Sequence, residues 1–247
     1  EFQVGVRWLN ARLEHMHETT KKHWTQDEAV QEQLKEEDSE VASLAHYVCE
    51  YGGFPAYENT GVKYFSCGED KIEELIRQLE KAEKFIFMEY FIVEEGIMWN
   101  TILEILKRKV AEGVEVRFMY DGMCAFDLLP YSYPKKLQKY GNRLYFNYRD
   151  HRKIAIIDGD IAYTGGANLA DEYANIIQRF GHWKDTAVLL RGDAVQSLTM
   201  IFLQMWDVDM RGVEPYGKYL TKKADTLNEK LGYVIPYADS PFDHENV

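Results

Sequence analysis

The chain has 247 residues, of which 46% are hydrophobic and 14% aromatic, and its formal net charge is −12. This composition is typical of a folded globular protein and excludes a disordered chain, and the length allows one large domain or two small ones. The acidic balance argues against nonspecific nucleic-acid binding, which depends on neutralising phosphates with Lys and Arg. No uncharged apolar run reaches the roughly 18 residues that predict a membrane-spanning helix, and the amino terminus lacks a signal-peptide pattern.

Residues 1–57 predict a helical amino-terminal region. An apolar stripe at three- and four-residue spacing is followed by a strongly acidic segment over residues 26–40. The stripe is suited to packing against the rest of the protein, although such a helix can also lie on a membrane surface. The loop Gly52-Gly53-Phe54-Pro55 is the best boundary before the next domain.

No metal site is expected from the cysteines or histidines. Three widely spaced cysteines form no ligand pattern, and their odd number favours a reduced, cytosolic setting with free thiols. Three histidines near the amino terminus lie on a polar amphipathic segment, where solvated side chains are commoner than ligands. These residues are Cys49, Cys67, Cys124, His15, His17 and His23. We therefore predict no metal and no other cofactor.

Beyond residue 58, strand patterns alternate with helix patterns. The predicted strands cover residues 62–65, 85–93, 114–120 and 186–190, and the predicted helices cover 70–84, 99–111 and 194–208. Residues 142–147 are treated as a loop. The alternation predicts an α/β fold with a mixed sheet and helices on its faces. Ligands of such sheets lie beyond the carboxyl ends of strands, where Glu89 and Asp121 fall. These two carboxylates could orient a catalytic side chain, or serve as structural acceptors or helix caps.

Two apolar runs, 154–157 and 161–164, flank Asp158-Gly159-Asp160. They predict a hairpin with a two-residue Gly-Asp loop. This register pairs Lys153 with Gly166 and His151 with Asn168, and strand alternation puts His151 and Lys153 on one face.

That face has the groups that phosphoryl transfer requires. Lys153 can neutralise a phosphoryl oxygen, Asn168 can donate a hydrogen bond to another, and the backbone of Gly165 and Gly166 can approach closely because no Cβ intervenes. The imidazole of His151 can act as nucleophile or proton donor. A local excess of basic residues over 131–160 suits a phosphate-bearing substrate. Each residue alone is more often structural, but together they predict a site for phosphoryl transfer.

The pattern His151-x-Lys153-x4-Asp158, followed by Gly165-Gly166-x-Asn168, resembles the HKD motif of the phospholipase D superfamily. The wider sequence resembles the bacterial cardiolipin synthase branch from about Val41 onward. The resembling segments are Glu89-Tyr90-Phe91-Ile92, Tyr120-Asp121-Gly122, Tyr148 to Ile154, Trp183-Lys184-Asp185-Thr186, Gly232-Tyr233-Val234 and Asp239-Ser240-Pro241. The resemblance implies a phospholipase D-like α/β/α sandwich, with a catalytic half-domain at 58–217 and a linker plus the start of a second half at 218–247.

The resemblance also implies a mechanism. Two HKD motifs meet in this family; one histidine attacks the phosphodiester to give a phosphohistidine, and the other protonates the leaving alkoxide. His151 would be the nucleophile, Lys153 and Asn168 would bind phosphoryl oxygens, and Asp158 would support the His–Lys pair. Gly165, Gly166, Glu89 and Asp121 would have supporting roles. The implied reaction converts two molecules of phosphatidylglycerol into cardiolipin and glycerol, without a metal.

The chain contains one such motif. His182-x-Lys184 has Leu189 where the motif requires Asp, so it is not a second copy. We therefore expect either a missing carboxyl-terminal half or a homodimer partner, and a protein associated with the cytoplasmic side of a bacterial membrane. Two alternatives remain open: a single-motif phosphodiesterase or nuclease working as a homodimer, and a catalytically silent half that binds lipid or a partner chain.

Overall fold

The computed structural model divides into two compact units, which are described separately. The first unit joins Glu1–Gly61 to Arg191–Val247, and the second is Val62–Leu190. The domain limits at residues 57 and 217 stay a prediction. The residues that the structure describes are 20, 22–23, 25–122, 128–130, 132–138, 143–147 (backbone), 151–207, 215–220 and 232–238.

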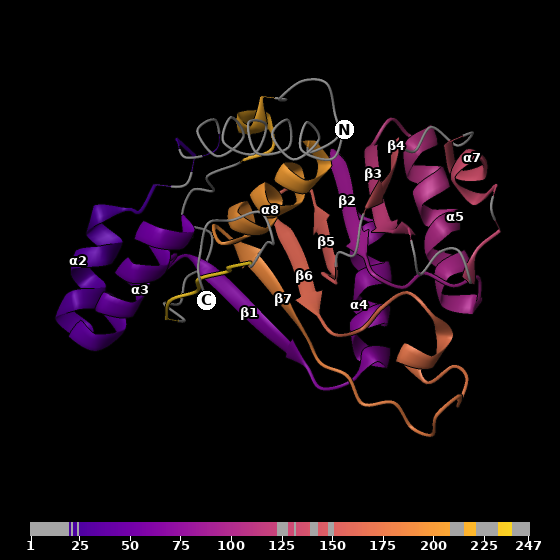
Figure 1. The fold of residues 1–247 in the computed structure, drawn as a ribbon, viewed down its shortest axis with the longest axis horizontal. Helices are drawn as coiled ribbons and strands as arrows, with labels where there is room; N and C mark the ends of the chain where they lie inside the picture. The colour runs from indigo at the N-terminus through magenta and orange to yellow at the C-terminus, as the bar shows by residue number, and fades with distance from the viewer. Residues whose placement is uncertain are drawn as a thin grey trace, which may run out of the picture. The chain divides into compact units, whose positions relative to one another are not determined.

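A seven-stranded sheet is the framework of the second unit (Figure 1). Its spatial order is β1-β7-β6-β5-β2-β3-β4. The strands are β1 (Thr60–Phe65), β2 (Phe85–Tyr90), β3 (Glu115–Asp121), β4 (Arg143–Asn147), β5 (Ile154–Ile157), β6 (Ile161–Gly165) and β7 (Ala187–Gly192). β2, β3 and β4 are parallel, whereas β5 is antiparallel to both β2 and β6. The predicted mixed sheet is confirmed.

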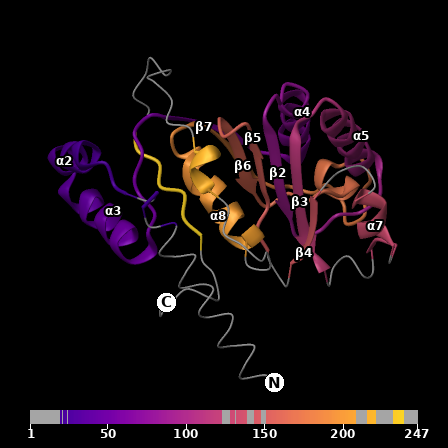
Figure 2. The same ribbon diagram turned by 90° about the horizontal axis from the view of Figure 1, so that it is seen from above.

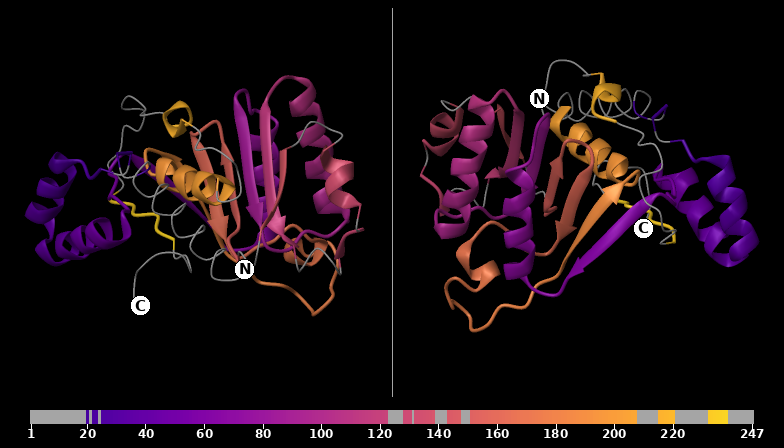
Figure 3. Two further views of the ribbon diagram at one scale, coloured as in Figure 1. Left: turned by 45° about the horizontal axis from the view of Figure 1, so that its top comes forward. Right: turned by 180° about the vertical axis from the view of Figure 1, so that it is seen from behind.

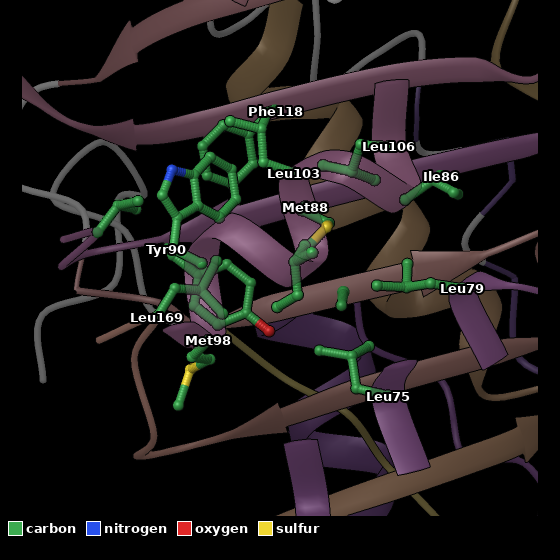
Figure 4. Close-up of a cluster of buried hydrophobic side chains, with 14 of the residues drawn as sticks. Leu75, Leu79, Ile86, Met88, Tyr90, Met98, Leu103, Leu106, Phe118 and Leu169 are labelled. Carbon is green, nitrogen blue, oxygen red and sulfur yellow. The ribbon is translucent and has the colours of Figure 1, made fainter. Parts of the chain in front are cut away.

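Helices α4 (Gly68–Leu79) and α5 (Ile97–Ala111) lie on the same side of β2 and β3 (Figure 2). Their side chains, including Leu75 and Leu106, join Ile86 and Met88 of β2 in one buried cluster (Figure 4). Fully burying an aliphatic side chain contributes about 1.5–3 kcal/mol. All six residues of β2 are buried, which explains why this strand is apolar at every position except Glu89 rather than alternating.

The β5–β6 hairpin has a three-residue loop, not the predicted two-residue loop. Ile157 pairs with Ile161, and the loop residues Asp158 and Gly159 have φ values of 56° and 69°. Asp tolerates the left-handed region better than most residues, and its side chain here accepts hydrogen bonds that hold it in the turn. The true register therefore differs by one residue from the prediction, and its continuation places Lys153 opposite Gly165.

The first unit contains a helical pair, α2 (Glu28–Glu37) and α3 (Ser39–Gly52), seen in indigo in Figure 3. Asp38 ends α2 and caps α3, because its carboxylate accepts hydrogen bonds from the N–H groups of Glu40 and Val41. The unit also contains α8 (Val195–Asp207) and the short helix η2 (Tyr216–Lys218). The predicted helical amino-terminal region is therefore present. The apolar stripe predicted near the amino terminus falls before residue 17 and lies outside the described residues.

The predicted elements agree with the structure in order and type. The exception is residues 143–147, which form β4 beside β3 rather than a loop. A short helix, α7 (Tyr133–Gln138), precedes β4, and a short 3₁₀ turn, η1 (Asp171–Ala174), follows Asn168. In the described part of the chain, no helix is both long and apolar enough to cross a bilayer.

Candidate active site

His151 lies just before β5, next to the carboxyl end of β2, because these two strands are antiparallel. Its side chain is exposed, and its ring centroid is 4.7 Å from that of Phe91, with an interplanar angle of 54°. An exposed imidazole beside an aromatic ring is both accessible to a ligand and restricted in its orientation. Phe91, which the sequence analysis did not single out, directly follows β2.

Lys153 approaches the same ring from within the fold. The residue is only 5% exposed, and its Nζ atom lies 5.2 Å from the Phe91 centroid, at a distance typical of a cation–π contact. Nζ also donates a hydrogen bond to the backbone carbonyl of His151. The structure thus brings His151 and Lys153 together, as predicted, and Phe91 contacts both.

The side chain of Asn168 contacts Ile92, the residue that follows Phe91 in the chain. Its Oδ1 accepts a hydrogen bond of 2.9 Å from the N–H of Ile92, and Leu169 N donates to Ile92 O at 3.1 Å. Asn168 is 3% exposed. Because Oδ1 is held by the backbone, the Nδ2 donors of the same amide point away from Ile92. His151, Lys153 and Asn168 therefore converge on Phe91 and Ile92, although not through the predicted register.

Gly165 and Gly166 lie where the end of β6 passes close to the segment before β7. A Cβ at Gly165, where φ is +154°, would lie 2.4 Å from Thr186 O, and one at Gly166 would lie 2.1 Å from Asp185 Oδ1. The N–H of Gly166 donates to Thr186 O at 3.0 Å. This N–H is therefore bonded to the segment before β7, and a supporting role of the two glycines at a phosphate stays a prediction. The glycines let two chain segments pass closely.

Asp158 is separated from His151 and Lys153 by the whole of β5. Its carboxylate accepts three hydrogen bonds, from the N–H groups of Glu83, Lys84 and Phe85, at 2.9, 2.7 and 2.9 Å. These bonds hold the chain where it enters β2. That Asp158 supports the His–Lys pair stays a prediction; the three hydrogen bonds of its carboxylate go to the residues that lead into β2.

Glu89 and Asp121 lie at the carboxyl ends of β2 and β3, as predicted, and each residue is 1% exposed. Glu89 forms an ion pair with Arg152, at 3.3 Å between Oε1 and a guanidinium nitrogen. Side chains alternate between the two faces of a strand. Arg152 therefore faces the opposite side from His151 and Lys153, and on that side it meets Glu89. Orientation of His151 by either carboxylate stays a prediction.

Two further observations concern possible ligands. Among the described residues, no group of three or more His, Cys, Asp or Glu side chains is placed to hold a metal ion. Of the three histidines considered at the amino terminus, His23 is described, and burial lowers its pKa. His15 and His17 lie outside the described residues, so nothing further bears on them.

Comparisons with known proteins agree with this arrangement. Residues 75–206 match the family described as cardiolipin synthase, PLD-like domain. An uncharacterised protein of Streptococcus mutans is 48% identical over 98% of the chain and 55% of its own length. The cardiolipin synthase of Oceanobacillus iheyensis is 37% identical over 75% of the chain and 41% of its own length. The chain spans about half the length of these curated relatives.

Two solved structures have a similar fold. NucT from Helicobacter pylori has 16% sequence identity and a TM-score of 0.50, over 60% of this chain and 97% of its own. The phosphatidylserine synthase of Haemophilus influenzae has 14% identity and a TM-score of 0.52, over 67% of this chain and 42% of its own. At such identities the likeness shows the fold alone, and the predicted α/β class is confirmed.

Proposed function

The chain belongs to the family of cardiolipin synthase PLD-like domains, and on that premise we propose that it is the first catalytic half of a phosphatidyltransferase that makes cardiolipin from phosphatidylglycerol. The observation that carries this proposal is the convergence of three side chains. His151, Lys153 and Asn168 meet around Phe91 and Ile92 at one end of the sheet. An imidazole, an ammonium and an amide in one place can attack, neutralise and orient a phosphodiester.

In the first step, a nitrogen of the His151 imidazole attacks the phosphorus of phosphatidylglycerol. A P–N bond forms, the P–O bond to the glycerol headgroup breaks, and the departing alkoxide takes a proton from a second histidine. Lys153 and the Nδ2 donors of Asn168 bind the phosphoryl oxygens, on which negative charge accumulates in the transition state. The products are phosphatidyl-His151 and free glycerol.

In the second step, a hydroxyl of another phosphatidylglycerol attacks the same phosphorus. The second histidine, now neutral, takes the hydroxyl proton, the P–N bond breaks, and cardiolipin leaves with His151 regenerated. If water attacks instead, the product is phosphatidic acid. Splitting the reaction into two displacements lets one site choose between acceptors.

The second histidine must come from another polypeptide segment. Because the chain spans about half of its curated relatives, we propose that a second half of the native protein supplies this histidine. A second copy of this chain, with the two His151 residues facing one site, is the other arrangement that completes the chemistry. Two molecules of phosphatidylglycerol and these side chains suffice for the reaction, so no cofactor is part of the proposal.

Exposed apolar side chains favour a lipid substrate over a nucleic acid. Ile97 is 65% exposed, and the segment after η1 exposes Ile176, Ile177 and Phe180 by 40%, 48% and 71%. The chain runs from the end of β6 through Asn168 and η1 into this segment (Figure 1). Asp171 connects it to α5, since its carboxylate accepts from Ile97 N and its carbonyl from Ile176 N. Such side chains suit acyl chains, whereas the net charge of −12 opposes phosphate-rich polymers.

The full chain, wild type and His151→Ala, would be incubated with vesicles of phosphatidylglycerol labelled in the headgroup glycerol. Where the chain lacks the second histidine, water must protonate the leaving alkoxide, so we expect the wild type to release glycerol slowly, up to one equivalent, and the variant to release none, with phosphatidyl-His151 trapped by rapid quenching. Continuous formation of cardiolipin requires the second histidine, and it should depend on protein concentration if two copies supply it.

Several outcomes would reject the proposal. Glycerol release by His151→Ala at the wild-type rate rules out His151 as the nucleophile. Cleavage of single-stranded DNA without any reaction of the lipid identifies a nuclease. A chain that binds vesicles but never forms the covalent intermediate is a silent binding half.

A further inference from the structure

The residues between Asn175 and Trp183 form a loop whose two ends are tied together. Asn175 directly follows η1 in the left-handed conformation, with φ of 51°. Its Oδ1 accepts a hydrogen bond of 2.6 Å from Trp183 N, and its Nδ2 donates to Trp183 O at 2.9 Å and to Glu69 Oε1 of α4 at 2.8 Å. One amide side chain therefore closes the loop and fastens it to α4, so residues 176–182 project as a preorganised unit (orange in Figure 1).

The exposed side chains of the 176–182 loop are mainly apolar. They are Ile176, Ile177 and Phe180. Exposed Ile97 of α5 is held beside them, because its N–H donates to the carboxylate of Asp171 while Ile176 N donates to the carbonyl of the same residue. Single apolar residues at a surface are ordinary, but four that are held together form a patch of the kind that contacts a membrane or a partner.

A cation lies among these apolar side chains. The Nη1 atom of Arg179 is 3.7 Å from Glu94 Oε2 and 3.4 Å from Glu172 Oε1, and the guanidinium carbon is 5.3 Å from the Phe180 ring centroid. The side chain of Arg179 is 49% exposed. Its polar contacts with the described residues use Nη1, which leaves the edge formed by Nε and Nη2 for a further acceptor. Two parallel N–H groups of this kind match the oxygens of a phosphate.

The acidity of the chain does not oppose an anionic ligand at this loop. The two carboxylates that contact Arg179 are already paired with it, Glu95 pairs with Lys136 at 2.9 Å, and Asp171 accepts hydrogen bonds from the first N–H groups of α5. Half of the net charge of −12 comes from residues 26–40, where seven acidic residues accompany one lysine. That segment belongs to the first unit, whereas the loop belongs to the second.

We propose that the 176–182 loop is a membrane-docking element, in which Ile177 and Phe180 enter the acyl-chain region while Arg179 binds the phosphate of an anionic phospholipid in the same leaflet. A bilayer offers both ligands at once, an apolar layer and, just above it, a layer of phosphates. A guanidinium held against an exposed aromatic ring suits the boundary between these layers, because the apolar part of each side chain can be buried while the charge stays at the headgroups.

Arg179 is connected to the candidate active site through Glu94. The N–H of Glu94 donates to Leu169 O at 3.0 Å, and Leu169 directly follows Asn168 in the chain. A lipid bound at Arg179 would therefore lie near the segment that carries Asn168, and its phosphate would not be the one that reacts. Docking brings the site to its substrate, and the choice of phosphatidylglycerol as the anionic lipid rests on the function proposed above.

The first test measures binding without turnover. The full chain with His151→Ala is sedimented with sucrose-loaded vesicles of phosphatidylcholine, alone or mixed with an equal amount of phosphatidylglycerol. We expect Arg179→Gln to lower the partition onto mixed vesicles about fivefold and to leave the partition onto phosphatidylcholine unchanged. Phe180→Ser should lower both. The matched control is Arg77→Gln of α4, because this guanidinium also contacts two carboxylates and its side chain is 56% exposed; it should bind like the parent.

Two further variants separate the local fold from the contact with lipid. Arg179→Lys keeps the charge beside Glu94 and Glu172 but loses the two parallel donors, so it should fold normally and still bind mixed vesicles less tightly than the parent. Asn175→Gly removes the bonds that close the loop and accepts a positive φ without strain. It should bind more weakly because the loop must then be ordered on the membrane.

The second test uses proteolysis. Trypsin cleaves after arginine, so the bond between Arg179 and Phe180 reports directly on the loop. Mixed vesicles should protect this bond, vesicles of phosphatidylcholine should protect it less, and soluble glycerol phosphate should not protect it. In solution, Asn175→Gly should be cut faster at this bond than the parent.

Several results would overturn the inference. Equal losses in Arg77→Gln and Arg179→Gln would assign the binding to net charge rather than to this loop. Protection by soluble glycerol phosphate would identify a phosphate site that needs no membrane, and self-association that Phe180→Ser abolishes would identify a contact between two copies. A chain that docks through Arg179 but never forms phosphatidyl-His151 keeps the inference and refutes the proposed function, whereas covalent reaction without docking at Arg179 does the reverse.

Discussion

The rings of Phe91 and His151 lie 4.7 Å apart, where the end of β2 meets the start of β5. Neither residue is part of a regular strand, and the register of the two strands brings them together. Lys153 contacts the same ring, at 5.2 Å from Nζ to the centroid. Phe91 is thus a common neighbour of the proposed nucleophile and the proposed phosphate-binding cation.

Replacement of Phe91 by Leu should impair catalysis more than folding. Leucine keeps an apolar side chain but removes the aromatic face, so His151 and Lys153 gain freedom. We expect the rate constant for phosphatidyl-His151 formation to fall on the order of 10-fold, with the melting temperature nearly unchanged. Tyr64→Leu, at an exposed aromatic of β1, is the control. An unchanged rate in Phe91→Leu would mean that the ring does not position these groups.

Asp158→Ala should impair folding more than catalysis. It leaves the N–H groups of Glu83, Lys84 and Phe85 without their acceptor, and it places Ala at a positive φ of 56°. We expect a loss of about 2–4 kcal/mol in the free energy of unfolding, measured in urea. The remaining folded protein should form the covalent intermediate at a near-normal rate. Glu83→Ala is the control: it removes an exposed carboxylate nearby and should change the free energy of unfolding little. A stable but inactive Asp158→Ala would assign Asp158 a direct chemical role.

Alanine at Gly165 should be far more costly than alanine at Gly113. Both positions have positive φ, +154° and +94°, but a Cβ at Gly113 meets nothing within 4 Å. Gly113→Ala therefore measures backbone strain alone, about 1–2 kcal/mol. Gly165→Ala adds a clash with Thr186 O at 2.4 Å and should cost about 2–3 kcal/mol more. Equal losses in thermal unfolding would show that the β6–β7 approach is not tight.

The pair Ile177→Ser and Phe180→Ser tests the lipid-facing segment. Both side chains are exposed, so we expect the melting temperature to stay within a few degrees. The reaction with phosphatidylglycerol vesicles should fall several-fold because apolar area is lost from the membrane contact, roughly 25 cal/mol per Å². The reaction with a short-chain, monomeric substrate should not change. A uniform loss on both substrates would place these residues in the reaction itself, and Val62→Ser on β1 is the control for exposed apolar area.

Arg152→Met should destabilise the second unit, since it removes a cation that pairs with Glu89, whose side chain is 2% exposed. Breaking such a pair costs about 3–5 kcal/mol when both partners are buried, and Arg152, with 21% of its side chain exposed, should lie at or below the lower limit. The double variant with Glu89→Gln should recover part of the loss. If urea unfolding shows no recovery, the pair does not account for the effect.

The sequence was sufficient for most strands and helices and for the three converging side chains, because these depend on local periodicity and on a short motif, but it did not predict β4. It was not sufficient for the hairpin register. Asp158 adopts its turn through hydrogen bonds to Glu83–Phe85, more than seventy residues away, and no local pattern contains them. The same applies to Gly165 and Gly166, because the close approach of Asp185 and Thr186 that leaves no room for a Cβ there lies outside any local pattern.

Lys71 shows another limit of periodicity. The apolar positions of α4 predict that its one lysine, Lys71, faces solvent, yet Lys71 lies on the same buried face as Leu75 and Gln78. A charged residue on an inner face cannot be recognised until the strand beneath it is known to end in Tyr90, whose hydroxyl accepts a hydrogen bond from Lys71. Phe91 was equally hidden, because an apolar residue after an apolar strand is ordinary.

The interval between Lys153 and Asp158 is filled by the four residues of β5. The spacing of the motif therefore also sets the length of a strand: Asp158 anchors one end of β5 to the start of β2, and His151 and Lys153 lie at the other end. Adding or deleting a single residue within β5 would keep every motif side chain in the protein, yet turn His151 and Lys153 toward the wrong surface.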